Sequence, residues 1–229
     1  MISATDLRLT FGKGTPLENP ALRGMSLTVN QGEFVTVIGS NGAGKSTFLN
    51  ALAGEVLVDS GTIVVDNLSL AIKRGQRRSL GTAVKNQYRE QFRESLSSLN
   101  LGLENRLSDK MGLLSGGQRQ AVSLLMASLT PSAILLLDEH TAALDPKTGA
   151  FVLALTTKII EEQKLTALMV THSMKQALEV GSRTVMLHQG EVVFDIKGKD
   201  REGLEVKDLL DLFETQRGLS VDDDSLLLG

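Results

Sequence analysis

One short stretch, G-S-N-G-A-G-K-S-T at residues 39–47, limits the possible folds of this chain more than any other feature. It matches the pattern G-x-x-x-x-G-K-[S/T] and lies between an apolar, β-branched run at 33–38 and a helical pattern at 46–53. A strand that turns through glycines into a helix directs backbone N–H groups and the helix N-terminus at one point, which favours phosphate binding. The stretch therefore predicts a nucleotide-phosphate site on an α/β fold.

Each residue type in this loop has a chemical reason. Glycines let N–H groups turn inward without a Cβ clash, Lys45 adds a positive charge for the outer phosphates, and the Ser46 hydroxyl can ligate Mg²⁺. The alternative is a glycine-rich turn with an incidental lysine. The nucleotide-binding residues predicted here are Gly39, Ser40, Asn41, Gly42, Ala43, Gly44, Lys45, Ser46 and Thr47.

Two carboxylates follow another apolar run, at 134–137. Ligands bind at the carboxyl ends of strands in open α/β sheets, so Asp138 and Glu139 are expected beside the phosphates. Asp138 is predicted to hold Mg²⁺, directly or through water, and Glu139 to polarise the water that attacks the γ-phosphate. The alternative is a pair of helix-capping acids at a strand–loop junction.

A second glycine-containing loop, L-S-G-G-Q at residues 114–118, precedes a helical pattern. Its Ser115, Gly116 and Gly117 predict another flexible helix N-terminus rich in N–H donors. One nucleotide does not need two phosphate cradles from one chain, so the second would make sense if it served another subunit's nucleotide. The alternative is an ordinary helix with serine as its N-cap.

Strands and helices alternate along the chain, which indicates a mostly parallel sheet covered on both faces. Asp145 followed by Pro146 predicts a helix start. Strands are expected at 5–11, 25–29, 33–38, 62–65, 134–137, 168–171, 184–187 and 192–194, the last two joined at Gln189-Gly190, and helices at 46–53, 86–99, 118–128, 146–162, 174–179 and 206–213.

Composition narrows the class of protein. The 229 residues carry 24 Lys and Arg against 27 Asp and Glu, a net charge of −3, so no basic surplus predicts a nucleic-acid partner. The absence of cysteine excludes disulfides and thiolate metal sites. No apolar run has the length of a membrane span and no signal peptide is evident, which predicts a soluble, intracellular chain.

Taken together, the motifs resemble those of the ATP-binding subunit of a bacterial ABC transporter, from about residue 4 to 195. Phe11 lies where the family carries an adenine-stacking aromatic residue, although it could equally be core. The matching segments are 39–47 with the Walker A loop, 114–118 with the family signature, 134–139 with the Walker B strand, 142–145 with the D-loop, and His172 with the switch histidine.

The resemblance implies a P-loop NTPase core with a mostly parallel sheet and an antiparallel β subdomain in 1–66 and 118–215, a small helical subdomain in 67–117 and a tail at 216–229. It implies a head-to-tail homodimer that encloses ATP and Mg²⁺, with Glu139 and His172 as catalytic residues. Each ATP would contact the Walker A loop of one chain and, from the other, Ser115, Gly116, Gly117, Gln118 and Asp145.

The resemblance also implies transmembrane permease subunits, an external substrate-binding protein and a place on the cytoplasmic face of the membrane. His140 replaces the proline that the family usually carries, and residues 138–146 resemble a bacterial subgroup linked to uptake of amino-acid-like solutes, aromatic ones among them. His140 and His188 themselves are assigned no role. The alternatives are an ABC-type ATPase without a transporter and a regulatory module that binds ATP without turnover.

One region departs from the family pattern. Lys45 and Ser115 are only 70 positions apart, and no glutamine follows the strand at 62–65 in the setting of the family's Gln-containing loop. We therefore predict that a segment is missing between Asp66 and Asn67. A basic cluster at 73–78 indicates a solvated loop or, alternatively, a contact with lipid or an acidic surface. A helical stripe of apolar residues, Tyr88, Phe92, Leu96 and Leu99, is expected in the subdomain core.

Overall fold

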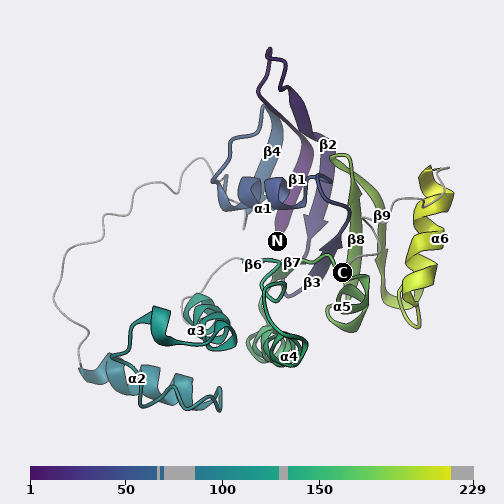
Figure 1. Cartoon of the computed structure of the whole chain (residues 1–229). Helices are drawn as coiled ribbons and strands as arrows, with labels where there is room; N and C mark the ends of the chain where they lie inside the picture. The colour runs from purple at the N-terminus through teal and green to yellow at the C-terminus, as the bar shows by residue number, and fades with distance from the viewer. Residues whose placement is uncertain (66–67, 70–85, 129–133, 218–229) are drawn as a thin grey trace. The chain divides into compact units, whose positions relative to one another are not determined.

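The computed structural model describes residues 1–65, 68–69, 86–128 and 134–217, which form two compact units (Figure 1). The first unit takes its described residues from 1–72, 133–139 and 163–229, and the second takes them from 73–132 and 140–162. These bounds differ from the expected subdomains, because the helices expected at 118–128 and 146–162 fall in the second unit.

The first unit contains two sheets. In the antiparallel sheet the order is β2-β1-β4-β5, with β1 Ile2–Phe11, β2 Asn19–Val29, β4 Ser60–Val65 and β5 Leu68–Ser69. In the other sheet the order is β6-β7-β3-β8-β9, with β6 Leu135–Asp138, β7 Ala167–Val170, β3 Phe34–Ile38, β8 Arg183–His188 and β9 Glu191–Lys197. The first four of these strands are parallel and β9 is antiparallel, which confirms the predicted fold class.

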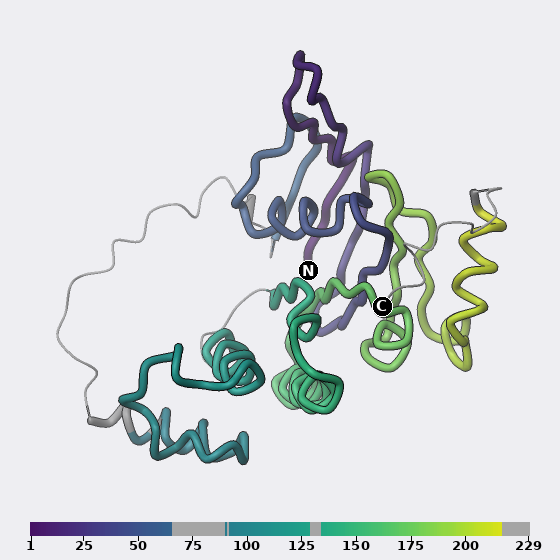
Figure 2. The backbone as a smooth tube through the Cα atoms, viewed as in Figure 1, coloured from purple at the N-terminus to yellow at the C-terminus, as the bar shows by residue number. Residues whose placement is uncertain are grey.

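Strand β3 is buried along its whole length because both of its faces are covered. Val35 and Val37 join a core shared with the antiparallel sheet and with α1 Lys45–Ala53. Ile38 points to the opposite face and packs with α5 Met174–Glu179 and α6 Val206–Arg217. Figure 2 traces the backbone through these layers, with α6 beside β9. The strand that carries the phosphate loop is therefore held on two sides.

The hairpin between β8 and β9 turns at Gln189 (φ 49°) and Gly190 (φ 80°), as the sequence predicts. Two successive residues with positive φ are typical of a type I′ turn, whose twist suits antiparallel strands. Gly190 is required there for a second reason, because a Cβ atom at this position would lie 2.7 Å from the Ala21 carbonyl oxygen. The hairpin thus packs directly against β2.

The second unit is helical. It contains α2 Asn86–Ser97, the 3₁₀ turn η2 Met111–Leu113, α3 Gly116–Ser128 and α4 Pro146–Gln163. Leu96 and Leu99 are buried in its core, as expected of the apolar stripe, while the side chain of Tyr88 lies outside the described part. The core consists of Leu96, Leu99, Leu103, Leu114, Ala121 and Leu125.

A second 3₁₀ turn, η3 Gly198–Asp200, follows β9 and precedes α6. Among the described residues, no helix is both long enough and apolar enough to cross a lipid bilayer. The predicted junction at 66–67, the basic cluster at 73–78 and the end of the chain from 218 lie outside the described residues.

Candidate functional site

The phosphate loop leaves β3 at Gly39 and enters α1 at Lys45. Gly39 has φ 147° and Gly44 has φ 97°, values that side-chain-bearing residues rarely adopt. A Cβ atom at Gly39 would lie 2.1 Å from the Leu187 carbonyl oxygen, and one at Gly44 would lie 2.6 Å from the Ala21 carbonyl oxygen. The glycines are thus needed for close backbone approach to β8 and β2 as well as for the turn itself.

Lys45 is almost fully buried and folds back over its own loop. Its Nζ donates to the carbonyl oxygens of Gly39 at 2.7 Å and Ser40 at 3.0 Å. Burial lowers the pKa of Lys45 from its ordinary value, while the carboxylates of Glu139 and Asp138 act in the opposite direction. Within the described residues, the hydrogen-bond partners of this buried ammonium group are neutral carbonyl oxygens, which a phosphate group could replace.

The parallel sheet brings the predicted carboxylates and histidine to this loop. The Glu139 N–H donates to Val170 at the end of β7, and the Thr171 N–H donates to Val37 at the end of β3. Because the carboxyl ends of parallel strands meet at one edge, Glu139 and His172 lie at the edge where β3 gives way to the phosphate loop. Glu139 also has a positive φ of 45°, an uncommon value for a residue with a side chain.

Glu139 and His172 are in direct contact. The Glu139 Oε1 atom lies 2.5 Å from His172 Nε2, and each side chain is about a third exposed. A carboxylate that accepts a hydrogen bond from an imidazole fixes the ring's orientation and leaves its second oxygen free for another partner. This pair can therefore hold a water molecule and accept its proton.

A pocket of about 190 Å³ contains most of the predicted nucleotide-binding residues. Phe11 is 45% exposed and lines the pocket, so it is not a core residue. Asn19 is its cross-strand partner, which places both side chains on one face of the β1–β2 hairpin. The lining comprises Phe11, Asn19, Ala21, Asn41, Gly42, Ala43, Gly44, Lys45, Ser46, Thr47, Glu139 and His172.

Asn19 and Ala21 were not identified from the sequence. Their place in the pocket follows from the pairing register of β1 with β2, which shifts at three points along the strands. Counting alternate residues along β2 would therefore not locate them. The one sequence clue to Asn19 is that it follows Phe11 after a short loop. This clue identifies Asn19 as a pocket residue only when the pairing register of β1 with β2 is known.

The residues predicted to hold Mg²⁺ fit an ion that arrives with a nucleotide. Ser46 and Asp138 are both exposed. Within the described part of the chain, no group of three or more His, Cys, Asp or Glu side chains could hold a metal by itself. Mg²⁺ commonly takes one or two protein ligands together with water and substrate phosphates, so two oxygen ligands beside a phosphate loop suit it.

The signature loop lies in the second unit and begins α3. The Ser115 N–H donates to Gln118 Oε1 at 3.0 Å, and the Gln118 N–H donates to Ser115 Oγ at 3.2 Å, which is a capping box. Gly117 is buried against α4, and a Cβ atom there would lie 2.2 Å from Cγ2 of Thr148. The expectation of two flexible glycines needs correction here, because Gly117 is a tight packing position.

Asp145 and His140, also in the second unit, both make local contacts. Asp145 Oδ1 accepts a hydrogen bond from the Thr148 N–H at 3.1 Å, which confirms the predicted cap of α4, and hydrogen bonds from Thr148 lower the pKa of Asp145. His140 Nε2 lies 2.9 Å from Thr156 Oγ1, and burial lowers the pKa of His140 to about 4. His140 is therefore neutral at pH 7.

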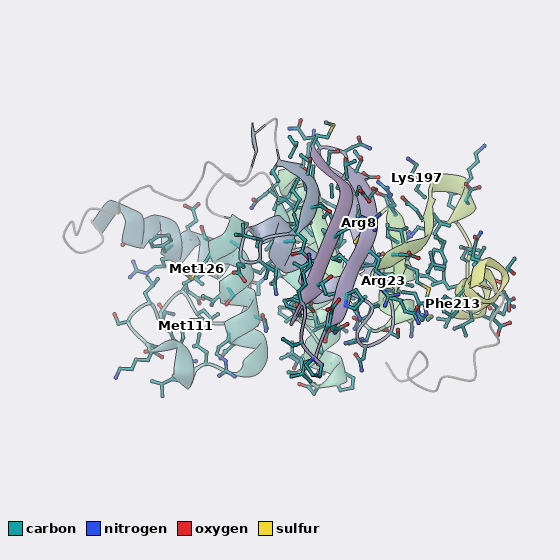
Figure 3. All side chains as sticks on the ribbon, turned by 90° about the horizontal axis from the view of Figure 1, so that it is seen from above. Arg8, Arg23, Met111, Met126, Lys197 and Phe213 are labelled. Atoms are coloured by element: carbon teal, nitrogen blue, oxygen red, sulfur yellow. The ribbon has the colours of Figure 1, made fainter. Side chains whose placement is uncertain are left out.

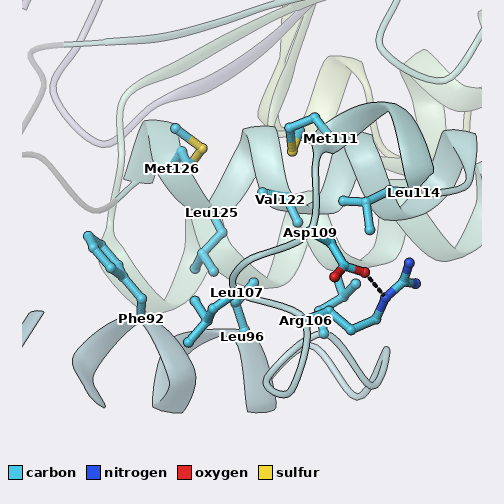
Figure 4. A pocket seen from close by; sticks show the side chains of 11 residues that line it. Phe92, Leu96, Arg106, Leu107, Asp109, Met111, Leu114, Val122, Leu125 and Met126 are labelled. Atoms are coloured by element: carbon cyan, nitrogen blue, oxygen red, sulfur yellow. Dashed lines mark hydrogen bonds and ion pairs between the residues drawn. The ribbon is translucent and has the colours of Figure 1, made fainter. Parts of the chain in front are cut away.

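Phe213 lies on α6 (Figure 3). The ring of His188 packs against it, with ring centroids 5.2 Å apart. A larger cavity, of about 360 Å³, lies within the second unit (Figure 4). Apolar side chains line most of it, and an ion pair between Arg106 Nε and Asp109 Oδ2 (2.7 Å) also contributes. None of its lining residues is a predicted site residue, so the chemistry is assigned to the smaller pocket.

Comparison with known proteins places these features in a family. The family pattern described as "ABC transporter" matches residues 22–142. The chain is 39% identical to a tyrosine transport ATP-binding protein of Clostridioides difficile, over 93% of this chain and 99% of that protein. It is 33% identical to the thiamine import ATP-binding protein ThiQ of Shigella flexneri, over 80% of this chain and 88% of ThiQ.

The alignment with the tyrosine transport protein spans 249 positions, which exceeds the 229 residues of this chain. Part of that relative therefore has no counterpart here. Among solved structures, the chain is similar to the dimeric ATP-binding cassette MJ0796 bound to ADP and Pi, with a TM-score of 0.72, 27% identity and coverage of 86% of this chain and 98% of that one. The ADP conformation of the cassette MJ1267, at 20% identity and a TM-score of 0.74, shares the fold.

Proposed function

The chain belongs to the ABC transporter family as an ATP-binding subunit with ATPase activity, and on this premise we propose that it hydrolyses Mg²⁺–ATP between two copies of itself to power import of a small solute. The observation that carries the proposal is the convergence of Lys45, Glu139 and His172 on one pocket. Each of the three comes from a different strand end of one parallel sheet.

ATP binding begins at the phosphate loop. Inward N–H groups and the N-terminus of α1 receive the phosphates, and Lys45 exchanges its two loop carbonyls for phosphate oxygens. Phe11 offers an exposed ring on which adenine can stack. Ser46 and Asp138 would hold Mg²⁺, which neutralises phosphate charge when it is bound.

Hydrolysis follows from the Glu139–His172 pair. Glu139 accepts a proton from a water molecule, whose oxygen forms a bond to the γ-phosphorus as the bond from phosphorus to the bridging β–γ oxygen breaks. His172 orients the carboxylate through their 2.5 Å contact and can contact the γ-phosphate with its ring. ADP and inorganic phosphate are the products.

A second copy would complete the site. Ser115, with Gly116, Gly117 and Gln118, forms a helix N-terminus that has no nucleotide-phosphate role in the pocket of the first unit. The similarity to a cassette whose solved structure is a dimer with ADP and Pi supports a head-to-tail pair in which this signature reaches the partner's ATP. Asp145 at the start of α4 would lie at the same interface.

Transport would be carried out by membrane partners. The relatives are named for transport of tyrosine and import of thiamine, and the tyrosine protein aligns over nearly the whole of both chains. These names support a permease partner, and with it an external substrate-binding protein and a place on the cytoplasmic face of the membrane. They also support an amino acid as the solute, an aromatic amino acid before any other. The alignment with that relative spans more positions than this chain has residues, which agrees with the prediction that a segment is missing after Asp66.

The variant Glu139→Gln tests the proposal. It removes the proton acceptor while it keeps the side-chain shape, so we expect ATP binding within twofold of wild type and phosphate release reduced by about a hundredfold or more. Static light scattering should show a stable dimer in ATP, because the trapped nucleotide is not hydrolysed. Cells that rely on this variant should lose uptake of labelled tyrosine.

Glu191→Gln is the matched control. Glu191 is exposed at the start of β9 and does not line the pocket, so its replacement should change neither phosphate release nor dimerisation. Unchanged steady-state phosphate release by Glu139→Gln would remove the assignment of Glu139. Unchanged tyrosine uptake, with phosphate release lost, would leave the ATPase assignment in place and exclude tyrosine as the solute.

A further inference from the structure

A partly buried arginine outside the nucleotide pocket closes the C-terminal end of α5. Arg201 follows η3, and its Nη2 amino group lies within hydrogen-bond distance of three carbonyl oxygens, those of Ala177 (2.7 Å), Leu178 (3.0 Å) and Val180 (2.6 Å). Its Nε donates to Thr184 Oγ1 at 2.9 Å. These carbonyls belong to the last turn of a helix, where no intrahelical donors remain, so Arg201 satisfies them and places a positive charge at the helix C-terminus.

Arg201 is also the start of a hydrogen-bond network. A guanidinium group only donates, so the Thr184 hydroxyl accepts from Arg201 and its own hydrogen remains for another acceptor. Its partners are Thr36 Oγ1 at 2.9 Å and the Ala177 carbonyl at 3.3 Å, and Thr36 Oγ1 in turn reaches the carbonyls of Ala177 and Arg183, both at 3.1 Å. Thr36 and Thr184 are completely buried, which strengthens each of these bonds.

This network joins the two sides of the nucleotide pocket. Thr36 lies on β3, the strand that ends at the phosphate loop. Ala177 lies on α5, the helix that begins directly after His172 and Ser173. Among the described residues, no carboxylate forms an ion pair with Arg201, so its donors act on backbone and hydroxyl oxygens alone.

The first turn of α5 fixes the backbone on both sides of His172. Ser173 Oγ accepts from the Gln176 N–H at 3.2 Å, the Ser173 N–H donates to Thr171 Oγ1 at 3.1 Å, and the Thr171 hydroxyl donates to Gln176 Oε1 at 3.1 Å. Because α5 has only six residues, it is too short to persist if one end loosens. Loss of the C-terminal closure would therefore reach the N-terminal turn.

We propose that Arg201 is a positioning residue for ATP hydrolysis: by closing the C-terminal end of α5 and orienting the Thr184–Thr36 pair, it holds His172 against Glu139. This inference rests on the proposed role of His172. Arg201 does not line the nucleotide pocket, and its effect is exerted through the helix. The consequence is that turnover depends on Arg201 while ATP binding does not.

The test is a double-mutant cycle on phosphate release by the whole chain. Arg201→Met should lower kcat about tenfold and leave KM for ATP within about twofold, because only the placement of His172 is lost. Arg201→Lys keeps the charge and the donors to the helix end, so kcat should stay within about threefold of wild type. In the His172→Ala background, Arg201→Met should change kcat by less than about twofold. The effects of two substitutions are not additive when one residue acts through the other.

Ile2→Ala is the control for general destabilisation. Ile2 is buried at the start of β1, in the core on the face of β3 opposite Thr36, so this variant should lower Tm without lowering kcat. If Arg201→Met does not fold, Arg201→Gln takes its place in the cycle. An equal loss of kcat in both backgrounds, or the same loss in Ile2→Ala, would overturn the inference. Unchanged kcat in His172→Ala alone would instead overturn the proposed role of the histidine.

Discussion

At the scale of single residues, the phosphate loop contains glycines of two kinds. Gly39 has φ 147° and lies so close to β8 that a Cβ atom would be 2.1 Å from a backbone oxygen. Gly42 has φ 78° but nothing within 4 Å of an added Cβ. The first therefore needs glycine for space and for conformation, and the second for conformation alone.

Two alanine variants separate these requirements. Gly42→Ala should lower the free energy of unfolding by about 1 kcal/mol, the cost of a left-handed conformation for a residue with a side chain. Gly39→Ala should cost about 3 kcal/mol, because a strand backbone must also move. Urea unfolding of both variants measures the difference. Equal costs would mean that the approach of Gly39 to Leu187 is not tight in solution.

Residue types could be predicted better than their contacts. Residues 39–47 and 138–139 were identified because their chemistry is carried by a local pattern of glycine, lysine and acid. The sequence could not show that Lys45 folds onto the carbonyls of Gly39 and Ser40, or that Asn19 lies opposite Phe11. Those contacts depend on loop geometry and on strand register, which bring together atoms that no local spacing relates.

At the scale of elements, α3 and α4 meet at Gly117. The Cγ2 methyl of Thr148 would lie 2.2 Å from a Cβ atom on Gly117, whereas the next atoms are at ordinary contact distances. The Thr148 N–H donates to Asp145 Oδ1 at 3.1 Å, which holds the Thr148 backbone at the start of α4. A single methyl group therefore decides which residues fit at position 117.

Gly117→Ala should lower the free energy of unfolding by about 2 kcal/mol through overpacking. Thr148→Ser removes the obstructing methyl group and keeps the hydroxyl. The double variant Gly117→Ala/Thr148→Ser should therefore be at least as stable as Thr148→Ser alone. Its free energy of unfolding could rise by up to about 1 kcal/mol, because alanine favours the helix more than glycine does. Chemical unfolding of the three variants and wild type completes the cycle. The same loss from Gly117→Ala in both backgrounds would contradict the packing account.

Most elements could be predicted because their signals are local. The apolar run of β3, the Asp145-Pro146 start of α4 and the Gln189-Gly190 turn each correspond to an observed element. The role of Gly117 could not be predicted, since a glycine that frees the backbone and a glycine that admits a neighbouring helix look alike in sequence. The tertiary contact with Thr148 distinguishes them.

At the scale of the whole molecule, the two units carry different halves of the proposed machinery. The first unit holds Lys45, Glu139 and His172, and the second holds Ser115 and Asp145. The sequence predicted both sets of residues. It could not show whether the signature loop contacts the nucleotide of its own chain or that of a partner chain. That question depends on assembly, which local patterns do not encode.

Mixing two defective variants distinguishes these possibilities. Lys45→Ala removes the phosphate ligand of the first unit, and Ser115→Arg blocks the signature with a bulky cation, so each variant alone should release almost no phosphate. In a mixed head-to-tail pair, the intact Lys45 of one chain faces the intact Ser115 of the other, which restores one of two sites. Since random pairing makes about half of the dimers mixed, an equimolar mixture should recover at most about a quarter of wild-type phosphate release.

The alternative gives a different result in the same measurement. If Ser115 completed the site of its own chain, every site in the mixture would contain one defect, and phosphate release would stay at the level of the separate variants. A mixture of Lys45→Ala with the double variant Lys45→Ala/Ser115→Arg is the control, because no pairing of these chains contains an intact Lys45. Recovery in the first mixture but not in the control requires that the signature acts on the neighbouring chain's nucleotide.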